Sequence, residues 1–235
     1  IGKWHLGDQD QFLPMAQGFD YYYGIPYSND MNRDNCPLPL MRNNEIIEAP
    51  VDQNTITKRY TEETIIFIEE NKSGPFFVYL PHAMTHNPLY ASEAFRGKSD
   101  NGIYGDAVLE IDWSTGEILE FLKNNDLDKN TLVIFSSDNG AASRFGGSNA
   151  PLAGWKGSTM EGGMRVPCIM WYPGTIPAGS QCEALTSTMD ILPTLAEMTG
   201  TELPEERIID GHNISDILKA ESEESPYEYF YYYQL

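Results

Sequence analysis

The sequence lacks any apolar run of about 18 residues or more, so no segment of this 235-residue chain is predicted to span a bilayer. Its three cysteines, Cys36, Cys168 and Cys182, form no CxxC spacing and cannot all pair with one another. The opening IGKWHLG has neither the basic nor the apolar region of a signal peptide. We therefore expect no membrane span, and neither a disulfide framework nor a targeting segment is indicated.

Basic residues are also scarce, with 15 Lys and Arg against 35 Asp and Glu and a formal net charge of -20. The long-range field of such a chain repels polyanions, which argues against a nucleic-acid partner or an anionic membrane surface. A small anionic substrate would need a local cationic pocket.

The remaining composition is that of a globular protein, with 41% hydrophobic and 12% aromatic residues. This supports one large domain over residues 1–235. The chain begins with Ile1 and ends in YEYFYYYQL (227–235), a strand-like aromatic run without a stop signal. We expect both ends to be cut from a longer protein.

Helical and strand patterns alternate along the chain. Apolar residues at three- and four-residue steps predict helices over 58–71, 106–124 and about 191–199, the last with Asp190 as its cap. The apolar runs FFVYL, TLVIFSS and VPCIMWY predict strands covered on both faces. The order predicts an α/β fold with a mostly parallel sheet flanked by helices on both faces.

Polar residues follow these predicted strands, where ligands bind in open α/β sheets. Asp138 and Asn139 come directly after TLVIFSS and offer hard oxygens suited to Ca²⁺ or Mg²⁺, although Asp-Asn-Gly is also a common turn. Lys156 lies in a Gly-flanked loop, where its ammonium could meet an anion. Arg165 is interpreted as part of an internal ion pair, with Asp190 as one possible partner.

Histidines supply the candidate acid. If GKWHLG is extended, Lys3 and His5 project from one face while Trp4 and Leu6 face the core; a solvated lysine beside a packed histidine is the alternative. His82 and His86 are spaced like a helical metal pair, but prolines bracket them. His86 alone is the better candidate for a general acid or an anion ligand.

The sequence motifs taken together are far more specific than any one of them. GKWHLG, THNP, SSDNG, GWKGSTMEGGMRVP and MDILPTL occur here in the order in which the sulfatase family has them, and the chain resembles the arylsulfatase type over nearly its whole length. The resemblance implies an alkaline-phosphatase-like fold and hydrolysis of sulfate esters, such as a sulfated sugar or an aryl sulfate.

The resemblance also implies roles for single residues. Lys3, His5 and Lys156 match residues of the sulfate pocket, and His86 matches the histidine that protonates the leaving alcohol. Asp138 and Asn139 match two ligands of the divalent cation. We expect these groups to gather around one oxyanion.

The family's nucleophile is a formylglycine made from the Cys or Ser of a C-x-P-S-R type motif, and this chain has no such motif, because Cys36 begins CPLPL. We expect the motif, two further metal-binding aspartates and the C-terminal subdomain to lie outside this chain. The fragment alone is therefore predicted to be inactive and to bind cations weakly. By resemblance the whole protein works in lysosomes, in the periplasm or outside the cell.

Two rival functions remain at this stage. A phosphatase, phosphodiesterase or phosphotransferase can share the scaffold, but two-metal members need more Asp and His ligands than this chain offers. A non-catalytic relative that binds sulfated glycans is the other alternative.

Overall fold

The computed structural model describes residues 1–31 and 35–232, and the chain divides into two compact units. Unit 1 contains Ile1–Leu127 and Ala142–Ser148, and unit 2 contains Asp128–Ala141 and Asn149–Leu235. That both units belong to one catalytic domain stays a prediction.

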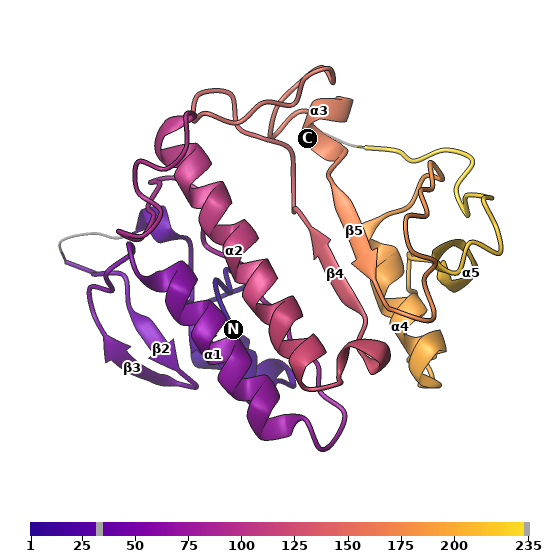
Figure 1. Ribbon diagram of the computed structural model, residues 1–235, viewed down its shortest axis with the longest axis horizontal. Helices are drawn as coiled ribbons and strands as arrows, with labels where there is room; N and C mark the ends of the chain where they lie inside the picture. The colour runs from indigo at the N-terminus through magenta and orange to yellow at the C-terminus, as the bar shows by residue number, and fades with distance from the viewer. Residues whose placement is uncertain (32–34, 233–235) are drawn as a thin grey trace. The chain divides into compact units, whose positions relative to one another are not determined.

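All three predicted helices form, and shorter ones accompany them (Figure 1). The α-helices are α1 (Ile56–Asn71), α2 (Gly102–Asn124), α3 (Glu161–Met164), α4 (Ile191–Thr199) and α5 (Ser215–Leu218). Short 3-10 helices lie at Asp10–Phe12, Pro14–Gln17, Asn29–Met31, Asp128–Asn130 and Thr188–Asp190. No helix in the described part of the chain combines the length and the apolar character that a membrane crossing requires.

The strands are β1 (Tyr23–Gly24), β2 (Leu40–Arg42), β3 (Glu45–Glu48), β4 (Val133–Ser136) and β5 (Cys168–Trp171). They form two ladders, β1-β2-β3 and β4-β5, in which every pair is antiparallel. These strands therefore pair antiparallel, whereas the sequence predicted a mostly parallel sheet. A tight turn at Asn43, with φ 54, makes β2 and β3 a hairpin, and the long loop between β4 and β5 brings the chain back in the opposite direction.

The strand predictions were only partly right. TLVIFSS and VPCIMWY contain β4 and β5, but Phe135 and Ile169 are 36% and 63% exposed, so these strands are not covered on both faces. The run FFVYL, residues 76–80, has no assigned strand, and Phe77 is 64% exposed. Residues 227–232 of the aromatic run are not a strand either, and the rest of that run lies outside the described residues.

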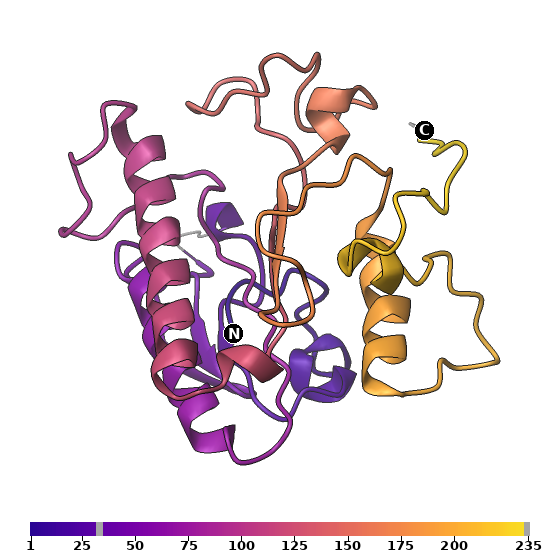
Figure 2. The ribbon, with the colours of Figure 1, turned by 45° about the vertical axis from the view of Figure 1, so that its right-hand side comes forward.

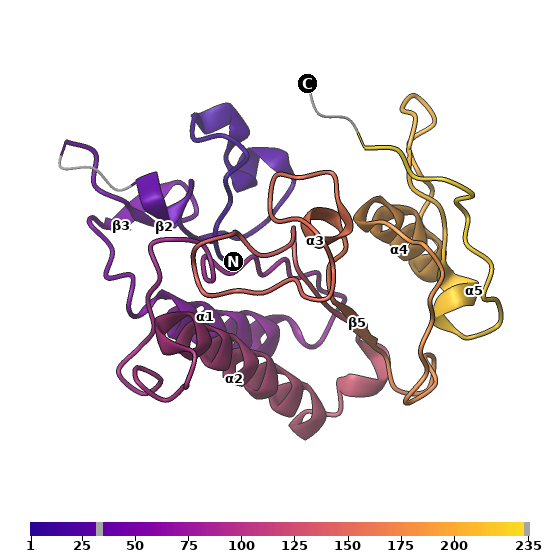
Figure 3. The same cartoon turned by 90° about the horizontal axis from the view of Figure 1, so that it is seen from above.

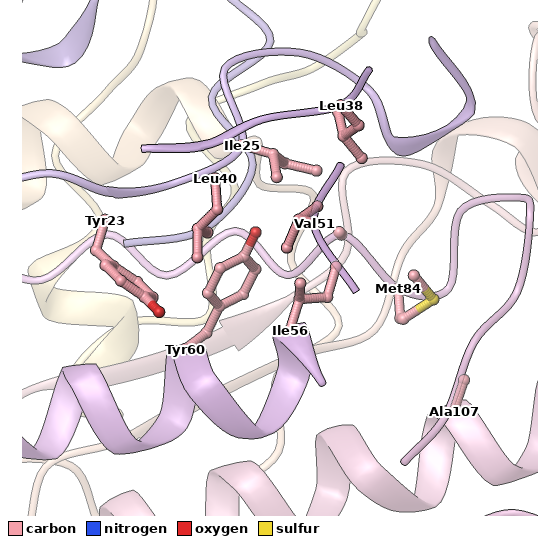
Figure 4. Close-up of a cluster of buried hydrophobic side chains, with 10 residues drawn as sticks. Tyr23, Ile25, Leu38, Leu40, Val51, Ile56, Tyr60, Met84 and Ala107 are labelled. Atoms are coloured by element: carbon pink, nitrogen blue, oxygen red, sulfur yellow. The ribbon is translucent and has the colours of Figure 1, made fainter. Parts of the chain in front are cut away.

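The core of unit 1 lies between α1 and the first ladder (Figure 4). Helix α1 contributes Ile56 and Tyr60, which are fully buried against Ile25, Leu38 and Leu40. Helix α2 lies beside α1 in both Figures 1 and 3. This core also includes Ala83 and Met84, which belong to the loop that carries His82 and His86.

The buried face of α2 differs from the apolar stripe that its sequence predicts. Val108 is 43% exposed, whereas Asp106, Glu110 and Ser114 are buried. Asp106 turns inward because its carboxylate accepts the backbone N–H groups of Gly97, Lys98 and Ser99, at 2.8, 3.0 and 2.8 Å. Satisfying these loop donors outweighs the burial of a valine.

Unit 2 contains α4 and α5, which pack against each other (Figure 2). Asp190 occupies the position before α4, as predicted, but its carboxylate makes no capping bond to that helix. It completes instead a capping box with Ser187 for the preceding 3-10 helix, and it accepts the backbone N–H of His212 at 2.8 Å. Asp190 therefore connects distant segments of unit 2.

Candidate active site

The GKWHLG segment of unit 1 is held by backbone hydrogen bonds on two sides. Gly2 and Trp4 donate to Tyr23 and Ile25 at 2.8 and 2.9 Å, and Lys3 donates to Pro81 at 2.8 Å. A side chain at Gly2 would overlap the Pro81 carbonyl, so the close approach requires glycine there. The segment thereby links the loop after β1 to the loop that carries the histidines.

Not all side chains of this segment lie as expected. Trp4 is half-buried and packs beside Leu13, Tyr22 and Met41, as predicted, but Leu6 is 67% exposed rather than in the core. His5 has a left-handed backbone with φ 54, so the chain is not extended there. Lys3 is half-buried and His5 is exposed.

His86 of unit 1 is half-buried and fixed through one ring nitrogen. Its Nδ1 lies 2.8 Å from the carbonyl of Asn87, 3.2 Å from Oδ1 of Asn29 and 3.4 Å from the hydroxyl of Ser28. Asn29 is fully buried. The imidazole is therefore presented by a rigid, polar cradle, as a positioned acid requires.

Asp30, which the sequence interpretation did not include, is a carboxylate in the same unit as His5 and His86. The Ser28 hydroxyl donates to Asp30 and lowers the pKa of its carboxyl; partial burial opposes this shift, and the nearby imidazoles of His86 and His5 add to it. Both imidazoles therefore act electrostatically on the carboxylate of Asp30.

The turn after β4 lies in unit 2. Asp138 is exposed and Asn139 is half-buried, and the Asn139 amide donates to Oδ1 of Asp138 at 2.6 Å. The Ser137 hydroxyl donates to the Asn139 carbonyl at 3.0 Å. These two bonds hold the bend at Asp138 and Asn139, as in the alternative of a local Asp-Asn-Gly turn, and the role of both residues as metal ligands stays a prediction.

Lys156 is tied to this turn through the backbone of its own loop. Its N–H donates to Ala141 at 3.0 Å, and Gly140 donates to Gly163 at 3.0 Å. Asn149 joins the two sides: its Oδ1 accepts from Ala141 N at 2.8 Å, and its amide donates to the carbonyls of Ala141 and Gly154, both at 3.1 Å. Unit 2 thus places Lys156 on a loop bonded to the Asp138–Asn139 turn.

Two secondary candidates have structural explanations. Arg165 pairs with Glu161 at 4.0 Å, which fits the predicted internal ion pair, and no such pair with Asp190 occurs in the described part of the chain. His82 lies beside Ser114, and burial lowers its pKa to about 4. A neutral, packed imidazole agrees with setting aside the His82–His86 metal pair.

The donor chemistry of the turn fits a hard divalent cation. The hydrogen bond between the two side chains uses Asn139 Nδ2 and Asp138 Oδ1. It does not involve Asp138 Oδ2 or Asn139 Oδ1, which are hard oxygens of the kind that such a cation binds. Within residues 1–31 and 35–232, no group of three or more His, Cys, Asp or Glu side chains is arranged to hold a metal ion. Asp138 and Asn139 therefore fit as part of a ligand set rather than as a complete one.

Sequence reasoning missed the residues that fix the candidate side chains within each unit. Ser28, Asn29 and Asp30 are contiguous, and their signal is the polar SND that follows the apolar GIPY. Asn149 stands in a Gly-Ser-Asn loop, which reads only as a turn. Their partners are distant in the sequence, so only the fold reveals their contacts.

Comparison with known proteins shows the family to which the chain belongs. The sulfatase family model matches residues 1–201. The N-acetylgalactosamine-6-sulfatase of Mus musculus is 41% identical over 98% of this chain and 48% of its own length. The steryl-sulfatase of Homo sapiens is 42% identical over 83% of this chain and 35% of its own length. The chain therefore belongs to the sulfatase family, and it spans about half the length of the curated relatives it matches.

Solved structures give the same answer for the fold. The PsFucS1 sulfatase from Pseudoalteromonas sp. has a TM-score of 0.87 at 29% identity and covers 96% of this chain and 52% of that one. Ps i-CgsB in complex with k-i-k-neocarrahexaose has a TM-score of 0.83 at 32% identity, over 96% of this chain and 55% of its own. The predicted α/β, alkaline-phosphatase-like fold is confirmed.

Proposed function

We propose that the full-length protein hydrolyses sulfate esters of a sulfated sugar or an aryl alcohol. The observation that carries the proposal is the kinship with an N-acetylgalactosamine-6-sulfatase over 98% of this chain. A sugar substrate is further supported by the oligosaccharide in the complex of Ps i-CgsB. The polar cradle around His86 supports the same chemistry.

The candidate residues have complementary roles in this reaction. A sulfate ester is already anionic, and its transition state places more negative charge on the bridging oxygen. Lys3, His5 and Lys156 would bind and stabilise the sulfuryl oxygens electrostatically. His86 would donate a proton to the departing alcohol oxygen. These contacts strengthen where water is excluded, because the local dielectric falls.

Asp138 and Asn139 would contribute oxygens to a Ca²⁺ or Mg²⁺ ion. When bound, such an ion supplies positive charge to the sulfuryl oxygens as a Lewis acid. The Ser137 hydroxyl and the amide of Asn139 fix the turn, so the two oxygens are oriented before a cation arrives. By family resemblance the nucleophile is a formylglycine that lies outside this chain.

The test is an assay of the full-length, matured protein on a chromogenic aryl sulfate, a 6-sulfated N-acetylgalactosamine and the matching aryl phosphate. We expect sulfate esters to be hydrolysed with a kcat/KM at least 100-fold above that for the phosphate. Lys156→Ala should lower kcat/KM by about 10²–10³-fold. Lys129→Ala, another exposed lysine of unit 2, is the matched control and should behave as wild type. Preferential hydrolysis of the phosphate ester would show a phosphatase, and no turnover of any ester would favour a binding protein.

A further inference from the structure

The loop that carries His86 is held by one fully buried side chain, Asn29. The Asn29 amide nitrogen lies 3.3 Å from the His86 carbonyl, 2.9 Å from the Pro88 carbonyl and 3.2 Å from Oε1 of Gln53. The Gln53 amide in turn donates to the Asn29 carbonyl at 3.2 Å. A single side chain thus binds the backbone on both sides of Asn87.

These contacts settle which way the Asn29 amide points. The nitrogen faces three oxygen atoms, none of which can donate a proton. Reversing the amide would place its oxygen against the same acceptors and lose every one of these bonds. The carbonyl oxygen of Asn29 therefore points toward the ring of His86, at 3.2 Å from Nδ1.

The direction of the amide decides the tautomer of the ring. Nδ1 of His86 faces two carbonyl oxygens, those of the Asn29 side chain and of the Asn87 backbone. Carbonyl oxygens only accept, so Nδ1 must carry the hydrogen. The Ser28 hydroxyl donates to Asp30, which leaves an oxygen lone pair rather than a proton to face Nδ1.

We propose that Asn29 is a positioning residue that clamps the His86 loop and holds the imidazole as the Nδ1–H tautomer, so that Nε2 is the nitrogen that carries and releases the catalytic proton. When the ring is an imidazolium, both nitrogens bear hydrogen. Loss of the Nε2 proton to the leaving oxygen returns the ring to the neutral tautomer that Asn29 and Asn87 stabilise. The catalytic meaning of this clamp rests on the proposed sulfatase function, but the clamp itself does not.

The direct test is long-range ¹H–¹⁵N correlation of the imidazole rings in this chain at about pH 8, above the ordinary imidazole pKa of about 6.5. The chain has only 4 histidines, so assignment by single His→Gln variants is practical. We expect Nδ1 of His86 to show the shift of a protonated nitrogen and Nε2 that of a bare one. A wild-type His86 with its hydrogen on Nε2 would overturn the proposal.

Variants separate positioning from general packing. Asn29→Ala should shift the tautomer ratio of His86 toward Nε2–H. Gln53→Ala is the matched control, because Gln53 is also buried and its side chain is hydrogen-bonded to Asn29 rather than to the His86 ring. The control should leave the His86 ratio unchanged. Equal shifts in both variants, or no shift in either, would refute a specific role for Asn29.

The wild-type spectrum tests the tautomer even if Asn29→Ala does not fold, and a third variant separates the tautomer from the clamp. In Asn29→Asp one carboxylate oxygen still accepts from Nδ1, more strongly because the hydrogen bond is charge-assisted, whereas the other oxygen faces the carbonyls of His86 and Pro88 and cannot donate to them. The Nδ1 hydrogen should remain and its proton resonance should move downfield. An unchanged resonance would mean that Asn29 is not its acceptor.

Kinetics of the full-length enzyme give an independent measure. Asn29→Ala should lower kcat about 10–100-fold with KM changed less than about threefold, since a misplaced acid affects the chemical step. If the wild type shows the Nδ1–H tautomer but hydrolyses no sulfate ester, the clamp stands and the proposed function fails.

Discussion

The two units hold their candidate site residues by different means. In unit 1, the ring of His86 contacts the Asn87 backbone carbonyl and also the side chains of Asn29 and Ser28. In unit 2, Lys156 is exposed and is fixed by its backbone bond to Ala141. Unit 1 therefore depends on the identity of the neighbouring side chains, whereas unit 2 depends on the path of the main chain.

The interiors of the units differ in the same sense. Unit 1 has an apolar core built around residues such as Ile25, Leu40 and Tyr60. In unit 2 the buried hydrophobic residues of the described chain are Ala196 and Ile214, and the polar Asp190, Thr194 and Ser215 are buried as well. Hydrogen bonds must therefore contribute a larger share of the stability of unit 2.

The largest effect is expected from Asp190→Ala. Its carboxylate is fully buried and accepts from Ser187 N at 2.7 Å, from His212 N at 2.8 Å and from the Tyr227 hydroxyl. Burial, together with this carboxylate, raises the pKa of Tyr227, so the phenol stays a donor. Removing the acceptor leaves these donors unsatisfied and should lower the free energy of unfolding by about 3–5 kcal/mol, measured by urea denaturation.

Asp216→Ala is the matched control for this variant. Asp216 is an exposed aspartate in the first turn of α5, where its loss should reduce stability by no more than about 1 kcal/mol. If Asp190→Ala costs as little as its control, polar contacts do not hold unit 2 together, and the comparison of the two units is wrong.

A second effect should appear only in unit 1, as a pH dependence of stability. Burial lowers the pKa of His82 to about 4 in the folded state, against about 6.5 in an unfolded chain. Because the folded pKa is the lower one, the unfolded state binds more protons between these values. The free energy of unfolding therefore keeps its full value above about pH 6.5, and it falls by about 3 kcal/mol in total as the pH drops toward 4.

Urea denaturation between pH 7.5 and 4.5 measures the slope of the unfolding free energy against pH. His82→Gln should flatten it, whereas His5→Gln, at an exposed histidine of the same unit, should leave it unchanged. Amide exchange in α1 and α2 should follow the pH more steeply than exchange in α4. A slope that persists in His82→Gln would assign the proton uptake to another group.

The contrast between the units also explains what the sequence could predict. Periodic apolar residues located α1, α2 and α4, since burial of one helical face is a local pattern. The candidate residues Lys3, His86, Asp138 and Lys156 were proposed from the order of their motifs along the chain, and their roles stay predictions. The prediction that the strands are covered on both faces was wrong at Phe135 and Ile169, because an apolar run does not reveal what covers it.

Residues with distant polar partners could not be found in this way. Asn29 contacts a loop whose positions are 57–59 residues away, and Asp190 contacts Tyr227, 37 residues away. Neither contact produces a periodic pattern in the sequence, because each depends on one side chain. The inward turn of Asp106 on α2 likewise follows from backbone donors that no hydropathy pattern records.

A third, smaller effect concerns the backbone path of unit 2. Asn149→Ala removes three hydrogen bonds that join Ala141 to Gly154 and should lower the free energy of unfolding by about 2–3 kcal/mol, since each net bond is worth about 1 kcal/mol. The amide hydrogen of Lys156 should exchange faster. Asn213→Ala, which loses one local bond to Ser215, should cost at most about 1 kcal/mol and leave Lys156 unaffected. Unchanged exchange at Lys156 in Asn149→Ala would show that the loop path is fixed by other contacts.

The smallest effects come from one surface ion pair in each unit. Glu48 and Arg59 of unit 1 lie 2.6 Å apart with side chains 34% and 26% exposed, and Arg59 also donates to the Tyr23 hydroxyl. Glu161 and Arg165 of unit 2 lie 4.0 Å apart with side chains 64% and 67% exposed. Solvent screens the second pair far more, so Glu48→Gln should cost about 1 kcal/mol and Glu161→Gln about 0.3 kcal/mol or less.

Salt distinguishes the two pairs further. Raising the NaCl concentration from about 0.1 to 1 M shortens the screening length from about 10 to 3 Å, so it should remove part of the Glu48→Gln difference and leave the Glu161→Gln difference near zero. Double-mutant cycles with Arg59→Met and Arg165→Met isolate each pair energy. A coupling for Glu161–Arg165 equal to that of Glu48–Arg59 would mean that the loop before β5 is as rigid as the core of unit 1. In that case the main chain of unit 2 would not be the sole means by which Lys156 is placed, and the contrast between the units would rest on Asp190 alone.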